Sequence, residues 1–86
     1  MAIARPQSRR QRAVEEIKHL ILSRFPDARF EITPMPDTRR GTAIWTHTSA
    51  DWDDVRALVV EREIELMLDD NVFIYVIPMP LEAHKA

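Results

Sequence analysis

The stretch VFIYVIPMP, residues 72–80, decides the fold that this sequence predicts. Its first six residues are all apolar or aromatic. A continuous apolar run of that length is typical of a strand that is buried on both faces. The run ends at Pro-Met-Pro, and proline has no N–H to donate to a strand ladder. We therefore expect a strand over residues 72–77 that the Pro-Met-Pro stops.

A second Pro-Met-Pro ends the stretch FEITPMP, residues 30–36. Phe30 and Ile32 alternate there with polar residues, which predicts a half-buried strand over residues 28–33. Residues 42–48, TAIWTHT, are rich in β-branched and aromatic side chains and form the predicted hairpin partner of that strand. Here too, the Pro-Met-Pro is expected to stop the strand.

Two helices complete the predicted elements. In residues 8–24, apolar side chains recur at three- and four-residue spacing, and this helix should end near Arg24 because Phe25 precedes a proline. We expect Ser8 to cap it without a capping box. The second helix is expected over residues 51–68, with the side chain of Asp51 capping the amide of Asp54.

The expected order is helix, strand, strand, helix, strand. This order predicts an α+β fold, a two-layer sandwich whose three-stranded sheet carries both helices on one face. One continuous second helix would make the last two strands parallel and put the two Pro-Met-Pro motifs at opposite ends of the sheet. A broken second helix would bring the motifs together. The order is similar to that of type II KH domains and of the N-terminal domain of ribosome maturation factors, but the Gly-containing loop of the KH domain is absent.

Length and composition favour a small domain that gains stability from a partner. The 86 residues contain no cysteine, so neither disulfides nor a zinc-thiolate site can add stability to a small core. We expect a flexible basic arm at residues 1–7, one domain at residues 8–80 and a short tail at residues 81–86. The N-terminal residues lack the apolar core of a signal peptide, and no apolar run approaches a membrane span. The expectation is a cytoplasmic homodimer.

The second predicted helix has two apolar stripes. One groups Trp52, Val55, Leu58, Val59 and Leu66, and the other groups Ala57, Val60, Ile64, Met67 and Leu68. One stripe can meet the sheet while the other meets the first helix or a second subunit. Alternatively, a single wide core face wraps around the helix, or the helix bends near Glu61.

The sheet offers a second candidate surface. If Ile44, Thr46 and Thr48 face the helices, the intervening side chains Trp45 and His47 lie on the open face. An exposed apolar patch of that size marks an interaction surface, and a second copy is its simplest cover. In the alternative, Trp45 points inward. The candidate interface residues are Trp45, His47, Phe73, Tyr75, Ile64 and Met67.

The sequence contains no recognisable catalytic or cofactor-binding motif. The chain has one glycine, so neither a dinucleotide-binding nor a P-loop motif can be written. His19, His47 and His84 do not stand at metal-ligand spacing, and the carboxylates that open the second helix are better explained by capping. We therefore expect no enzyme activity, metal, cofactor or small-molecule ligand.

Charge leaves nucleic-acid binding as the alternative. The first 24 residues carry six basic and two acidic side chains, whereas residues 51–70 carry two basic and eight acidic ones. Arg39 and Arg40 in the predicted turn, with Arg9 and Arg10, could contact phosphates. The acidic chain argues against this, because such domains tend to be basic. The sequence thus predicts an interaction or regulatory module, with RNA- or ribosome-associated binding as the second hypothesis.

Overall fold

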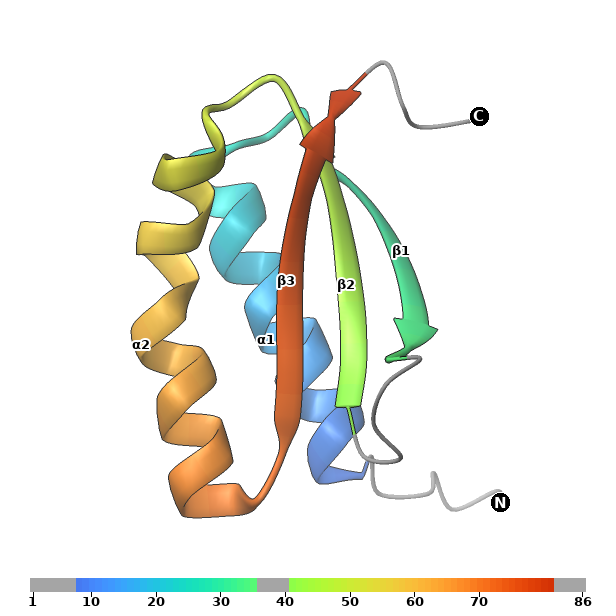
Figure 1. Cartoon of the computed structure of the whole chain (residues 1–86), viewed down its shortest axis with the longest axis vertical. Helices are drawn as coiled ribbons and strands as arrows, with labels where there is room; N and C mark the ends of the chain where they lie inside the picture. Colours follow the sequence, from blue (N-terminus) through green and yellow to red (C-terminus); the bar gives the residue numbers. More distant parts are fainter. Residues whose placement is uncertain (1–7, 36–40, 82–86) are drawn as a thin grey trace, which may run out of the picture.

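The computed structural model describes residues 8–35 and 41–81, and it has the predicted α+β architecture. The elements are α1 (Arg9–Arg24), β1 (Arg29–Pro34), β2 (Gly41–Thr48), α2 (Trp52–Asp70) and β3 (Phe73–Pro80). Both helices lie on one face of the three-stranded sheet, so the predicted two-layer sandwich is confirmed (Figure 1). The expected arm and the turn with Arg39 and Arg40 lie outside the described residues, as does the tail beyond Leu81.

The sheet has the order β1-β2-β3, with β2 in the centre. β1 pairs antiparallel with β2, where Ile32 lies opposite Ile44, and β3 pairs parallel with β2, where Val76 lies opposite Ile44. The continuous helix α2 makes the crossover between the two parallel strands. The ends of β1 and β3 therefore lie at opposite ends of the sheet, as predicted for the two Pro-Met-Pro motifs (Figure 1).

The prediction that Pro-Met-Pro stops the last strand was wrong, because β3 continues to Pro80. The backbone groups of successive strand residues point to alternate edges. The N–H of Val76 points away from β2, since Glu63 on α2 accepts it at 2.9 Å. Pro78 and Pro80 share that orientation, so they lack an N–H only on the outer edge of the sheet. Proline is tolerated at such positions of an edge strand.

The same rule holds on β1, the other edge strand. The N–H of Met35 donates to the carbonyl of Gly41 across the hairpin at 2.9 Å. The backbone nitrogen of Pro34, one residue earlier, therefore faces away from β2, where the lack of an N–H breaks no ladder hydrogen bond. The described prolines of the two motifs, Pro34, Pro78 and Pro80, therefore remove no hydrogen bond between the strands.

The helix caps differ from the prediction at both N-termini. Ser8 accepts the N–H of Gln11, and the Gln11 side chain accepts the N–H of Ser8, both at 3.1 Å. The expectation of no capping box was wrong, because Gln11 stands at the third helical position. The Asp51 side chain makes no cap hydrogen bond, and the N–H of Asp54 instead meets the Asp51 carbonyl at 3.1 Å. Asn71 ends α2 in the left-handed region at φ 56°.

The core lies between the helices and the sheet. Buried side chains from α1, α2, β2 and β3 form it: Ala13, Val14, Ile17, Ile21, Ile44, Val55, Val59, Leu66, Val72, Ile74 and Val76, together with Ala28 before β1. The stripe of α2 that reaches the core is the one with Val55, Val59 and Leu66, but Trp52, which the sequence groups with them, is 65% exposed. Within the described part of the chain, no helix is long and apolar enough to cross a membrane.

Candidate interaction surfaces

The open face of the sheet carries most of the predicted interface residues. Ile44 and Val76 belong to the core, so the side chains that alternate with them point away from the helices. That set comprises Ala43, Trp45 and His47 on β2 and Phe73, Tyr75, Ile77 and Met79 on β3. Trp45 and His47 thus share one face with Phe73 and Tyr75, and Trp45 does not point into the core. Their role as an interface stays a prediction.

Neighbouring strands hold the two central side chains of this face. The indole N–H of Trp45 donates to the Thr33 hydroxyl at 2.8 Å. His47 is only 4% exposed, with Nδ1 3.4 Å from the Pro80 carbonyl and Nε2 3.8 Å from the Glu31 carboxylate. Tyr75 is the most exposed aromatic residue of the face, at 36%. The face therefore presents a fixed apolar surface whose accessible aromatic group lies on the edge strand β3.

The second stripe of α2 is a separate surface. Val60, Ile64, Met67 and Leu68 are 36, 47, 40 and 73% exposed, and Ala57 is exposed too. This stripe does not contact α1. The side of α2 that faces α1 is the opposite one, from which Arg62 donates a hydrogen bond to Glu16. The structure therefore divides the predicted interface, with Ile64 and Met67 on the helix and the other residues on the sheet.

Sequence reasoning missed a polar clamp between α2 and the edge of β3. Arg56 Nη1 donates to both carboxylate oxygens of Glu63 at 3.2 and 3.1 Å and to the Val76 carbonyl at 3.0 Å. Glu63 Oε2 in turn accepts the Val76 N–H. Burial raises the pKa of Glu63, against the opposing effects of the Val76 N–H and Arg56. The spacing of seven residues, which puts both side chains on one helix face, was the only signal in the sequence.

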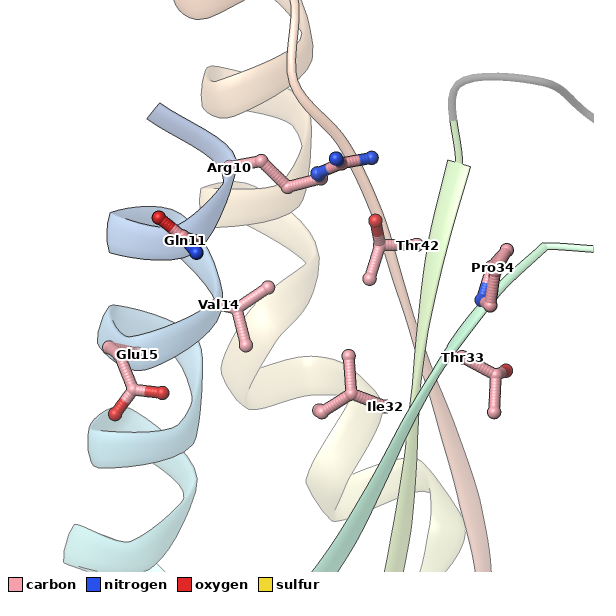
Figure 2. Close-up of a pocket in the computed structure, with 8 residues that line it drawn as sticks. All are labelled: Arg10, Gln11, Val14, Glu15, Ile32, Thr33, Pro34 and Thr42. Carbon is pink, nitrogen blue, oxygen red and sulfur yellow. The ribbon is translucent and has the colours of Figure 1, made fainter. Parts of the chain in front are cut away.

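The N-terminus of α1 gathers cations. Arg9, Arg10 and Arg12 make no hydrogen bond or ion pair with any residue that the structure describes, and the first turn has no acidic side chain. Arg10 reaches across a groove of ≈ 470 Å³ between α1 and β1, whose apolar lining includes Val14 and Ile32 (Figure 2). Cations are unfavourable at a helix N-terminus, so α1 places these arginines against its own dipole. Of the predicted nucleic-acid contacts, Arg9 and Arg10 lie here.

The opposite end of the molecule is tied together by a carboxylate. Asp27 accepts hydrogen bonds from the Thr48 hydroxyl at 2.5 Å, from the Ser49 N–H at 3.2 Å and from the Ser49 hydroxyl. The hydrogen bonds from Ser49 and then Thr48 lower the pKa of Asp27. Asp27 thus fixes the connection between α1 and β1 to the connection between β2 and α2.

The described residues offer no metal site, because nowhere among them do three metal-ligating side chains gather. No family model, curated protein or solved structure matches the chain. Any function must therefore be inferred from the chemistry of the two apolar surfaces and of the charged groups beside them.

Proposed function

We propose that this protein is a small homodimeric interaction module without catalytic machinery, and that its two copies pack through the open faces of their sheets. The supporting observation is the apolar and aromatic character of the open face on β2 and β3 (Trp45, Phe73, Tyr75, Ile77 and Met79). Both helices lie on the other face of the sheet (Figure 1). No other helix or strand among the described residues lies over the open face, and Trp45, Phe73, Ile77 and Met79 are partly exposed there beside Tyr75. An accessible apolar face of this kind favours an interaction surface.

Charge favours a second copy as the cover of this face. Besides His47, the charged residues on its three strands are Arg29 and Glu31, which have opposite signs. Two identical faces can therefore meet across a two-fold axis without net repulsion. The hydrogen bond of Trp45 to Thr33 fixes the indole before association, which reduces the entropic cost of binding.

The test is the solution mass of a Tyr75→Arg variant, measured by light scattering after size-exclusion chromatography. Tyr75 is 36% exposed, so an arginine there should leave the monomer folded. We expect wild type to be a dimer and Tyr75→Arg to be a monomer, because the charge would be buried without a partner. Trp45→Arg should also give monomers or insoluble protein, but it removes the hydrogen bond to Thr33 as well.

Leu22→Arg is the matched control, since Leu22 is 38% exposed on α1 and lies away from the sheet face. This variant should remain a dimer. A monomeric wild type, or a dimeric and folded Tyr75→Arg variant, would contradict the proposed dimer.

A second candidate function is binding of a single-stranded RNA backbone by the cations at the N-terminus of α1. Arg9 and Arg10 oppose the helix dipole and have no partner in the described chain, which suggests that an anion neutralises them. Fluorescence anisotropy with a labelled oligouridylate at low salt would test this. Arg9→Glu with Arg10→Glu should abolish binding, while Arg24→Glu at the other end of α1 should not. Equal binding by all three proteins would reject this candidate.

A further inference from the structure

The exposed stripe of α2 has the spacing of a helix-packing seam. Ala57, Val60, Ile64 and Met67 recur at intervals of three, four and three residues, and Leu68 extends the stripe at its C-terminal end. This is the spacing of the a and d positions of a heptad repeat, whose side chains interlock with those of a facing helix. The seam is exposed, and neither α1 nor any other element between residues 8 and 35 or 41 and 81 packs against it. The spacing therefore suits a helical occupant.

The neighbouring edge of β3 does not suit a strand as the occupant. The N–H and carbonyl of Val76 are taken by Glu63 and Arg56. Pro78 and Pro80 have no N–H to offer along the same edge. Strand addition needs a row of free backbone groups, which this edge lacks over its C-terminal half. A partner at this side of the molecule must bind through side chains.

The charges around the stripe select the kind of helix. Three carboxylates of α2 lie on or beside the stripe and make no ion pair with any described residue: Asp53, Asp54 and Glu61. Asp70 lies elsewhere, next to Arg9 and Arg12 of α1. The two cations of the helix are already engaged, Arg56 with Glu63 and Arg62 with Glu16 and Glu65. One flank of the stripe, at Asp54 and Glu61, is therefore negative, whereas the flank towards β3 carries the paired Arg56 and Glu63. Two copies of α2 would repel each other there, whereas a cationic partner would be attracted.

We propose that the α2 stripe docks a cationic amphipathic helix of another protein. The apolar side chains of that helix would pack on Val60, Ile64 and Met67, and its lysine or arginine residues would face the free carboxylates. This surface is separate from the open sheet face, so the inference goes beyond the proposed homodimer and does not depend on it. It gives the dimer two identical docking sites, one on each copy.

The first experiment measures binding of a synthetic probe to the full-length protein by fluorescence anisotropy. The probe is a labelled peptide of about five helical turns, with leucine at the a and d positions and lysine elsewhere. Two comparison peptides have glutamate in place of lysine, or the same composition in scrambled order. We expect the amphipathic lysine peptide to bind at least about tenfold more tightly than either. Equal binding of the lysine and scrambled peptides would show charge attraction alone and overturn the proposal.

The second experiment locates the site with variants. Ile64→Lys with Met67→Lys should weaken binding of the lysine peptide at least about tenfold, because both apolar contacts are lost and two like charges are added. Leu22→Lys, on α1, should bind as wild type does. Asp54→Asn with Glu61→Gln should weaken binding and reduce its dependence on salt, which a purely apolar contact would not show. Unchanged binding by either double variant would overturn the proposal.

The mass of the Ile64→Lys, Met67→Lys variant separates this inference from the proposed dimer. If the stripe docks another protein, this variant keeps the solution mass of wild type. If it becomes a monomer while Tyr75→Arg stays a dimer, a second copy occupies the stripe and both proposals fail together. If Tyr75→Arg abolishes the dimer without changing peptide binding, both proposals stand as separate functions.

Discussion

Glu63 shows how one side chain can serve both a helix and a sheet edge. Its side chain is 10% exposed, and its Oε2 accepts both the Val76 N–H and Arg56. Burial raises its pKa above the ordinary value of 4.5, so protonation is more favourable in the folded state than in the unfolded state. Folding stability from this group is therefore fully present below about pH 4.5 and is lost as the pH rises through the folded pKa.

We predict that Glu63→Gln removes this pH dependence. A glutamine oxygen can accept both hydrogen bonds without ionising, so the stability of the variant relative to wild type should rise as the pH increases from about 4.5 to 7. Glu63→Ala should instead cost about 1–3 kcal/mol of unfolding free energy, because the Val76 N–H and Arg56 lose their partner. Urea unfolding of the three proteins across this pH range measures both effects.

Asp27→Asn, measured in the same titration extended into acid, should show the opposite pH dependence. Hydrogen bonds from Ser49 and Thr48 lower the pKa of Asp27, so its stabilising effect is present above about pH 3.8 and is lost as the pH falls through the folded pKa. The deficit of Asp27→Asn should therefore shrink in acid. If the stability of Glu63→Gln relative to wild type falls as the pH rises, burial is not the dominant influence on Glu63.

At the scale of the element, the prolines of β3 protect an edge strand. Pro78 and Pro80 follow Val76 at alternate positions, so the outer edge of β3 offers no N–H at the two prolines and a bound N–H at Val76. Edge strands with free backbone groups are templates for pairing with other chains. The clamp of Arg56 and Glu63 and the two prolines together leave few free backbone groups on the outer edge of β3 along its C-terminal half. Another strand therefore cannot pair there.

Replacing both prolines by valine should therefore promote self-assembly. Pro78→Val with Pro80→Val adds two outward N–H groups on β3 and keeps the apolar character of the strand. We expect light scattering at high protein concentration to rise faster than for wild type while the far-ultraviolet circular dichroism stays similar. Pro26→Ala, in the turn before β1, is the matched control and should scatter as wild type does. Scattering that does not change in the double variant would show that the clamp alone protects the edge.

The elements themselves could be predicted from the sequence because their patterns are local. The spacing of Ile17 and Ile21 predicts a helix face, and the alternation around Ile44 predicts a strand, whatever lies beside them. The end of β3 could not be predicted, because Pro78 and Pro80 are tolerated only on an edge strand, and the strand order is not local. The clamp of Arg56 and Glu63 on Val76 was missed for the same reason, since it forms only when α2 lies beside β3.

At the scale of the whole molecule, an ion pair links the basic helix to the acidic one. Both Arg62 Nη2, at 3.0 Å, and Arg62 Nε contact the carboxylate of Glu16 on α1, and Arg62 Nη1 also lies 3.4 Å from Glu65. The hydrogen bond from Arg62 lowers the pKa of Glu16. A two-point contact of this kind adds geometric specificity to the packing of α2 against α1. The side chains are 34 and 47% exposed for Arg62 and Glu16, so solvent screens their attraction.

We predict a small, salt-sensitive coupling between these two residues. In a double-mutant cycle with Glu16→Ala and Arg62→Ala, the coupling free energy should be about 0.5–1 kcal/mol at low salt and should fall towards zero near 1 M NaCl. Glu15 and Lys18, which pair within α1 at 3.3 Å, serve as the control pair and should couple by no more than about 0.5 kcal/mol. A coupling that persists at high salt would mean that the pair orients the helices by its hydrogen bonds. In that case Glu16→Gln, which can still accept from Arg62, should retain most of the wild-type stability where Glu16→Ala does not.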